Sequence, residues 1–426
     1  MDSKDEHRLA AAEILRRNDR GGYTVPNGAI YPFQWNWDSA FVALGFAELD
    51  ISRAWQEIET LFLGQWADGF VPHIVFWQDD AGYFPGPERW QANGAQTGVP
   101  TSGITQPPVA ATVVRRIFEK APSRLAHARL ANLFPRIFAW HRWFAANRDF
   151  EGKGVCVAVH PWETGRDNSP EWDQPGERID TSRIAPYTRR DTDHLDAAMR
   201  PRHVDYDRYV ALVDHGRSCG WDHAAIAQTS PFRVADVGLS MILLRANRDL
   251  LELARLLGRT GDAREIAGWI ARSEDGLAWL WNDELDSWCS RDTVDAAFCP
   301  YVTSASFLSF YAGLADPDRD RAMVAHLEQM GEQTRYLVPS LAPWHSVFEP
   351  ARYWRGPVWA VLNLMIGLGL EECGQGDLAQ QVRSDTAELI AKGGFSEAFS
   401  PLDGVATGGQ NFSWTAAVYL HWAKPE

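Results

Sequence analysis

The amino-acid sequence predicts an all-α fold whose helices close into an (α/α)6 barrel, a toroid with an inner and an outer wall. Three observations support this prediction. Apolar residues recur at helical spacing along most of the 426 residues, the predicted helices form neighbouring pairs joined by short turns, and about six pairs fill the chain. A helical hairpin cannot bury its inner face alone, so the pairs must stack, and six can close into a ring. An open helical solenoid is the main alternative, and it would show stricter repeats and polar caps.

The clearest helical pattern begins at Ile51, where Ile51, Trp55, Ile58, Phe62 and Trp66 lie three or four residues apart. Because an α-helix has 3.6 residues per turn, these side chains share one face. Comparable patterns predict about thirteen helices, over residues 4–17, 37–49, 51–66, 107–120, 123–148, 203–218, 231–258, 261–283, 303–315, 317–331, 355–373, 375–392 and 411–423.

Turn signals mark several of the boundaries. Asp316 followed by Pro317 predicts a helix start, with the aspartate as N-cap and the proline at the first helical position. Residues 260–262 and 374–377 contain glycine and predict breaks between paired helices. Residues 353–359 are predicted to open a helix, because Pro357 lies early in it.

Two stretches, at about residues 67–106 and 150–230, interrupt the helical pattern with clusters of glycine and proline. They are too long for connecting loops, and their aromatic residues argue against disorder. We predict that residues 1–426 form a single catalytic domain and that these two insertions form lids over one end of the barrel.

Aromatic residues are in surplus, with 20 Trp, 20 Phe and 11 Tyr, or 12% of the chain. Indoles commonly line cavities that bind the flat faces of sugars, although large helix–helix cores also consume tryptophan. The net charge of −15 argues against nucleic acid and anionic membranes as partners. No stretch of about eighteen apolar residues is present, so no membrane span is predicted.

The five cysteines form neither a disulfide framework nor a metal-binding pair, and the N-terminal residues are polar. We therefore expect a cytoplasmic, reduced protein without a cofactor or a metal. The sequence leaves the oligomeric state open, a homo-oligomer included.

The first candidate site cluster is residues 31–41, in which Tyr31, Phe33, Trp35 and Trp37 precede Asp38. An aspartate at this place commonly caps a helix, here one starting near Ser39. Four aromatic rings before a cap are unusual, however. We favour the hypothesis that Asp38 faces the barrel cavity and binds sugar hydroxyls.

The second cluster, residues 160–170, contains Asp167 in a non-helical segment. A general acid must keep its proton near neutral pH, which apolar burial by Trp162 and Pro170 would achieve. Arg166 would oppose this if it pointed at Asp167, and a simple turn or ion pair is the alternative.

The third cluster, residues 393–401, places Glu397 between Phe395 and Phe399 after two glycines. Inverting glycosidases use an acid and a base carboxylate about 6.5–9.5 Å apart, with a water between the base and the sugar. Glu397 is the candidate base, and a loop glutamate without catalytic role is the alternative.

Further candidates surround these carboxylates. Arg200, close in sequence to Tyr206, forms a basic spot suited to a ligand carboxylate, although Arg200 and Arg202 could instead pair with Asp205 and Asp207. His73 lies in a predicted loop, where a histidine is more often structural than catalytic.

Together, residues 35–41, 164–170, 353–359 and 395–397 resemble glycoside hydrolase family 63, and within it the bacterial mannosylglycerate and glucosylglycerate hydrolases. The resemblance runs from Tyr31 to about Trp414, with the motifs in the family's order. It implies an (α/α)6 barrel and inverting hydrolysis of an α-glycoside, with Asp167 as general acid and Glu397 as general base. It also suggests that Arg166 points away from Asp167.

By position in the motifs, the resemblance implies two groups of binding residues. Those around the sugar would be Tyr31, Trp37, Asp38, Tyr353, Trp354, Trp359 and Gln410. Those around the glycerate would be His73, Tyr83, Gln106, Arg200 and Tyr206, with Arg200 matching the carboxylate.

The sequence therefore predicts an enzyme that cleaves a small anionic α-glycoside, glucosylglycerate or mannosylglycerate, into hexose and glycerate. Three alternatives stay open. The chain could be another α-glucosidase, acting on trehalose or an α-linked disaccharide. It could be a sugar epimerase or polysaccharide lyase on the same barrel, although no histidine pair is evident. It could also be a sugar-binding or scaffold protein without catalysis.

Overall fold

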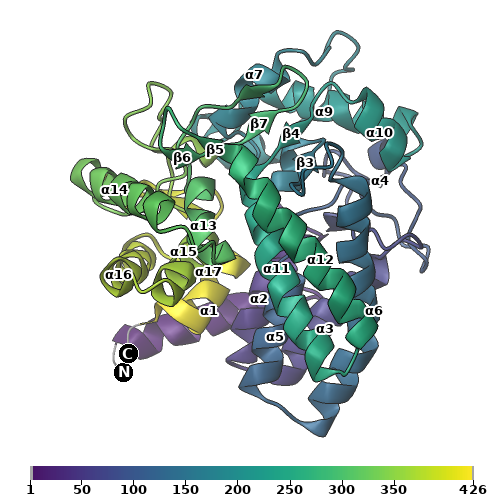
Figure 1. Cartoon of the computed structure of the whole chain (residues 1–426), viewed down its shortest axis with the longest axis horizontal. Helices are drawn as coiled ribbons and strands as arrows, with labels where there is room; N and C mark the ends of the chain where they lie inside the picture. Colours follow the sequence, from purple (N-terminus) through teal and green to yellow (C-terminus); the bar gives the residue numbers. More distant parts are fainter. Residues whose placement is uncertain (1–2, 425–426) are drawn as a thin grey trace.

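The computed structural model describes residues 3–424, and six helices form the inner wall of its barrel (Figure 1). Each inner helix contacts the next, and the last returns to the first, so the ring closes. The inner helices are α2 (Asn36–Ala47), α5 (Ala110–Lys120), α11 (Val237–Leu256), α13 (Leu308–Ala312), α15 (Ala360–Glu372) and α17 (Ser413–Val418). The predicted all-α toroid is confirmed.

The composition of the inner helices explains their place. Every residue of α2, α13 and α17 is buried, and so are most residues of α15. A helix that is apolar on all sides is stable only when other elements surround it.

The outer helices are amphipathic and bury one face against the inner ring. α3 packs on α2, α6 on α5, α12 on α11, α16 on α15, and α1 on α17, while α14 contacts the strand β6. Figure 1 shows α12 running beside α11. The outer helices are α1 (Ser3–Asn18), α3 (Ile51–Leu61), α6 (Arg124–Asn147), α12 (Thr260–Leu277), α14 (Pro317–Gln333) and α16 (Gly376–Gly393).

Most helix boundaries lie within a few residues of the prediction, but α11 begins six residues later than predicted and α12 ends six residues earlier, where residues 234–235 and 281–282 are strands. Asp316 caps α14 through the Arg319 amide, as predicted. The break between α11 and α12 lies at residues 257–259, where Gly258 has φ +67°, and not at residues 260–262. The predicted helix start at Pro357 is wrong: α15 begins at Ala360, because the Val358 amide donates to the Phe399 carbonyl at 2.7 Å and keeps this segment extended.

Short elements from the two insertions gather at one end of the barrel, where Figure 1 shows α7, α9 and α10. The first insertion holds β2 (Ile74–Val75) and α4 (Pro87–Trp90), and β2 pairs with β1 (Gln34–Trp35) in antiparallel register, Trp35 opposite Ile74. The second holds β3 (Val157–Ala158), α7 (Asp173–Gly176), α8 (Arg190–His194), α9 (His203–Ser218) and α10 (His223–Thr229).

The remaining strands are two residues long. β3 opens an antiparallel sheet of order β3–β4–β7–β8, with β4 (Val234–Ala235), β7 (Arg291–Asp292) and β8 (Ala297–Phe298). Two further pairs are β5 (Trp281–Asn282) with β6 (Ser287–Trp288), and β9 (Ala398–Phe399) with β10 (Ala406–Thr407). Across residues 3–424, no helix combines the length and the apolar character that spanning a bilayer requires.

Candidate active site

A cavity of about 810 Å³, its open mouth included, lies where the three sequence clusters and the two insertions meet. Its wall contains every predicted site residue except Trp359 and Gln410. These wall residues are Tyr31, Trp37, Asp38, His73, Tyr83, Gln106, Asp167, Arg200, Tyr206, Tyr353, Trp354 and Glu397. Segments far apart in the chain therefore build one site.

Asp167 has the properties of a general acid. Burial raises the pKa of its carboxyl to about 7, against the opposing charge of Arg200, and the negative charge of Glu397 adds to the rise. A carboxyl with this pKa keeps its proton in about half of the molecules at pH 7, whereas one with its ordinary pKa would be almost fully ionised, so Asp167 can donate a proton to a leaving group.

Arg166 turns away from Asp167. Its guanidinium contacts Glu171 and Asp236 instead, and all three of these side chains are buried. Asp236 is also the N-cap of α11, so Arg166 ties the loop that carries Asp167 to an inner helix. The structure agrees with the suggestion that Arg166 leaves the acid's proton in place.

Glu397 precedes β9, is almost fully buried, and accepts hydrogen bonds from three residues. The Tyr31 hydroxyl donates to Oε1 at 3.0 Å, and the Gly409 amide donates to Oε2 at 2.9 Å. Nη1 of Arg200 lies 3.2 Å from Oε1 and 3.1 Å from Oε2. Gly408 makes this packing possible, since a Cβ at its φ of +73° would lie 2.4 Å from Oε2 of Glu397.

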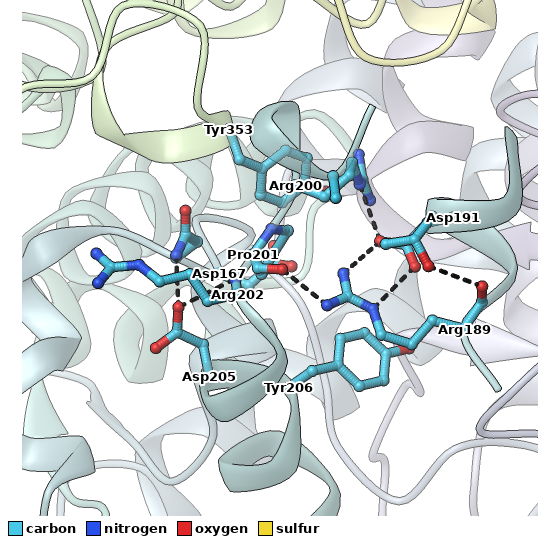
Figure 2. Close-up of polar contacts among 12 residues, drawn as sticks. Asp167, Arg189, Asp191, Arg200, Pro201, Arg202, Asp205, Tyr206 and Tyr353 are labelled. Atoms are coloured by element: carbon cyan, nitrogen blue, oxygen red, sulfur yellow. Dashed lines mark hydrogen bonds and ion pairs between the residues drawn. The ribbon is translucent and has the colours of Figure 1, made fainter. Parts of the chain in front are cut away.

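Arg200 pairs with Glu397 and Asp191, and not with Asp205 or Asp207. Figure 2 shows its contact with Asp191. Its Nε donates to Asp191 at 2.9 Å, its Nη2 to the Tyr31 hydroxyl at 2.6 Å, and its guanidinium lies 4.2 Å from the centre of the Tyr353 ring. Asp191 was not among the residues predicted for the site. The signal that could have indicated it is the charged run at residues 189–191 within an insertion.

Asp38 is not a helix cap, which corrects one interpretation of the sequence. α2 begins at Asn36, two residues before Asp38, so the aspartate lies in the first turn. Its buried carboxyl lines the cavity, and burial together with the charge of Glu397 raises its pKa well above the usual range. Within residues 3–424 it makes no hydrogen bond to another side chain, which leaves its oxygens available for ligand hydroxyls.

Indoles form one wall of the cavity. Trp37 lies 6.4 Å from Trp354 and 5.8 Å, edge to face, from Trp414, measured between ring centroids. Trp359 stands behind this wall, parallel to Trp354 at 4.0 Å, and does not line the cavity. Gln410 is exposed and donates to the Ser396 hydroxyl at 3.1 Å, next to Glu397. Neither residue therefore faces the cavity.

Apart from Arg200, the predicted glycerate residues contribute polar groups without charge. Burial lowers the pKa of His73 well below its usual value, and its Nδ1 lies 2.7 Å from the Ser102 hydroxyl. Gln106 accepts from the Trp37 amide at 3.2 Å. The Tyr206 hydroxyl donates to the Phe84 carbonyl at 3.0 Å. The cavity wall contains two cations, Arg200 and Arg190, and Arg190 is paired with Asp80.

The surplus of tryptophan serves both purposes that the sequence left open. Trp140 and Trp143 are buried in the packing of α6 and do not line the cavity, whereas Trp35 and Trp162 line it together with Trp37.

Within residues 3–424, no group of three or more His, Cys, Asp or Glu side chains is arranged so that it could hold a metal ion.

The two candidate catalytic carboxylates line one cavity without touching. Within the described part of the chain, no hydrogen bond joins Asp167 to Glu397, while the charge of Glu397 acts on Asp167. Two carboxyl groups therefore share one cavity: Asp167 with a raised pKa, and Glu397 held by hydrogen bonds from the protein.

The chain is similar to known glycoside hydrolases over nearly its whole length. Residues 31–415 match the family model of the mannosylglycerate hydrolase MGH1-like glycoside hydrolase domain. The chain is 46% identical to a mannosylglycerate hydrolase from Thermus thermophilus, over 98% of this chain and 100% of that protein. It is 35% identical to a glucosylglycerate hydrolase from Mycolicibacterium hassiacum, over 97% and 96%.

A solved structure extends the likeness to three dimensions. The GH63 mannosylglycerate hydrolase from T. thermophilus, in complex with Tris and D-glycerate, matches with a TM-score of 0.94 at 46% identity, over 97% of this chain and 99% of that chain. The family-model match and the relatives of similar length both span nearly the whole sequence. The chain therefore belongs to the MGH1-like mannosylglycerate hydrolases of glycoside hydrolase family 63.

Proposed function

We propose that this protein is an inverting glycosidase that hydrolyses glucosylglycerate, mannosylglycerate or both to hexose and glycerate. The observation that carries the proposal is that two carboxyl groups line one indole-walled cavity and do not hydrogen-bond to each other. They are Asp167, whose pKa is about 7, and Glu397. The family relationship supports it, because relatives across the full length are named for these two substrates.

In the proposed mechanism, the two carboxyl groups act on opposite sides of the anomeric carbon. Glu397 takes a proton from water while the water oxygen bonds to C1. The C1–O bond to the aglycone breaks, and its oxygen receives the proton of Asp167. The attacking oxygen ends on the face opposite the leaving group, so the configuration at C1 inverts.

The hexose would lie against Trp37 and Trp354, with its hydroxyls on Asp38, Tyr31 and Tyr353. Apolar sugar faces suit flat indole rings, and the unpartnered carboxyl of Asp38 suits hydroxyl donors. Trp359 and Gln410 would act indirectly, by supporting Trp354 and the Ser396–Glu397 segment.

The glycerate would lie toward the insertions, near His73, Tyr83, Gln106 and Tyr206. Its carboxylate would pair with Arg200, which compensates locally for the net charge of −15. Guanidinium and carboxylate form two parallel hydrogen bonds, which gives such a pair its specificity.

An assay panel tests the proposal directly. The purified enzyme is incubated with glucosylglycerate, mannosylglycerate, trehalose and an α-linked glucose disaccharide, and free hexose is measured. Release from at least one glycerate glycoside, with kcat/KM well above that for both disaccharides, is the expected result. Preference for a disaccharide would contradict it.

The epimerase alternative requires a free histidine base, and His160, which does not line the cavity, does not supply one. Burial lowers the pKa of His160 to about 3, its Nδ1 accepts from the Trp162 amide, and its Nε2 faces the Tyr209 carbonyl. It is therefore no free base.

The five cysteines are unpaired, which agrees with the proposed cytoplasmic location.

A further inference from the structure

Three donors from the protein itself contact the Glu397 carboxylate, and one of them, Arg200, contacts both of its oxygens. A carboxylate offers about four lone-pair positions. Tyr31 fills one on Oε1, Gly409 fills one on Oε2, and Nη1 of Arg200 approaches both oxygens, at 3.2 and 3.1 Å. A water can be activated only by a lone pair that is free to accept its proton. A carboxylate whose two oxygens are shared by a guanidinium is a poorer acceptor for that proton, so Glu397 acts best as a base once Arg200 has left.

Arg200 is the donor that is able to leave. The Gly409 amide is fixed, because the same backbone segment accepts from the Glu397 amide at 2.7 Å. The Tyr31 ring is fixed between Trp35 and Phe412, with centroids 5.3 and 5.8 Å away. Arg200 reaches the base by its long side chain alone, from the segment between α8 and α9 in the second insertion.

Asp191 provides a pivot for that side chain (Figure 2). It accepts from Nε of Arg200 at 2.9 Å, and Arg189 fixes it through two hydrogen bonds of 3.1 and 2.7 Å. The Arg200 carbonyl accepts from Arg352 at 2.8 Å, so the backbone is anchored too. Rotation about this anchored end would move the Nη groups away from Glu397 while Nε keeps its partner.

We propose that Arg200, pivoting on Asp191, makes hydrolysis depend on an anionic aglycone: it covers Glu397 in the empty enzyme and is drawn away by the carboxylate of the bound substrate. This inference rests on the proposed function, because it requires a substrate with a carboxylate. In an inverting enzyme the base and the aglycone lie on opposite faces of the sugar, so one guanidinium cannot serve both at once.

The exchange explains how the enzyme would reject neutral glycosides. With glycerate bound, one guanidinium–carboxylate pair replaces another, so uncovering the base costs little free energy. A neutral aglycone offers no replacement, and removing Arg200 from Glu397 would then leave a buried charge pair broken. Glycosides without a carboxylate would bind an enzyme whose base stays covered.

Glycosyl fluorides separate the two steps. α-D-Glucosyl fluoride and α-D-mannosyl fluoride carry no aglycone carboxylate and leave the aglycone position empty. On cleavage, the C1–F bond breaks, fluoride departs, and Glu397 takes the proton of the attacking water. The proposal predicts that added D-glycerate accelerates this reaction of the wild-type enzyme at least fivefold, in a saturable manner, and that glycerol at equal concentration does not.

Two variants complete the experiment. Arg200→Ala should hydrolyse the fluorides faster than the wild-type enzyme does without glycerate, and glycerate should no longer accelerate it, because its base is never covered. Arg202→Ala is the matched control. This neighbouring arginine is exposed and its ion pair is with Glu349, at 3.8 Å, so the control should keep the full response to glycerate.

The outcomes distinguish this inference from the proposed function. Three results with the wild-type enzyme would overturn the role of Arg200. Glycerate could leave the rate of fluoride hydrolysis unchanged, it could only inhibit the reaction, or no hydrolysis could occur with or without glycerate. Any of these results together with cleavage of a glycerate glycoside rejects this inference alone. Failure to cleave either glycerate glycoside rejects the proposed function itself.

Discussion

Gly165 lies so close to the indole of Trp37 that a Cβ atom on the glycine would stand 2.6 Å from the ring. Its φ of +70° is also one that residues with a side chain rarely adopt. Gly165 stands two residues before Asp167, while Trp37 lies on the inner helix α2. The loop that carries Asp167, the proposed general acid, therefore packs directly against the indole wall of the cavity.

We expect Gly165→Ala to lower kcat/KM at least tenfold, because the methyl group must push apart Trp37 and the loop that carries Asp167. Gly152→Ala is the control: Gly152 has φ +61° but nothing within 4 Å of its Cβ position. Both variants should lose about 1 kcal/mol of unfolding free energy to backbone strain. Equal activity of the two variants would show that the contact with Trp37 is unimportant.

The pH profile of kcat/KM should fall on its basic side with a pKa of about 7, as Asp167 loses its proton. Burial raises this pKa and the charge of Arg200 lowers it. Removing that cation in Arg200→Ala should therefore move the basic limb to higher pH. A shift to lower pH would contradict the assignment of Asp167 as the acid.

Replacing the acid and replacing the base should affect activity differently, depending on the leaving group of the substrate. Asp167→Ala should reduce hydrolysis of the glycerate glycosides roughly 10²–10⁴-fold, the usual contribution of a positioned general acid. It should affect α-glycosyl fluorides much less, because fluoride departs without protonation. Glu397→Ala should abolish both reactions. Similar losses of Asp167→Ala on both substrates would argue against its role, provided that circular dichroism shows a folded variant.

Replacing Arg166 should affect stability strongly. Its buried guanidinium compensates Glu171 and Asp236, so Arg166→Met leaves two buried carboxylates without a cation. We expect a loss of about 3–5 kcal/mol in the free energy of unfolding, measured by urea titration. Arg321→Met removes an exposed ion pair with Asp318 and should cost less than about 1 kcal/mol.

The stereochemistry of the product tests the inverting mechanism. Proton NMR recorded during the first turnovers should show the released hexose in the β configuration, followed by slow mutarotation. An initial α product would indicate a covalent intermediate on the enzyme and would exclude Glu397 as a base that acts only through water.

The helices, their pairing and most residues of the cavity wall can be predicted from the amino-acid sequence. The pattern from Ile51 onward and the Asp316 cap depend on neighbours within a few residues, so they can be recognised without knowing the fold. The motifs around Trp37, Asp167 and Glu397 likewise carry enough residues to be recognised together.

Which side chains of the site contact one another can be seen only in the tertiary structure. Arg200 and Glu397 are 197 residues apart, and nothing local indicates that they bond. Three further features depend in the same way on how the helices close into a ring. They are the ion pair of Arg166 with Asp236, the hydrogen bond of Arg200 to Asp191, and the positions of Trp359 and Gln410 outside the cavity. Charge compensation and burial act through space, and a linear sequence shows the groups concerned without showing their distances.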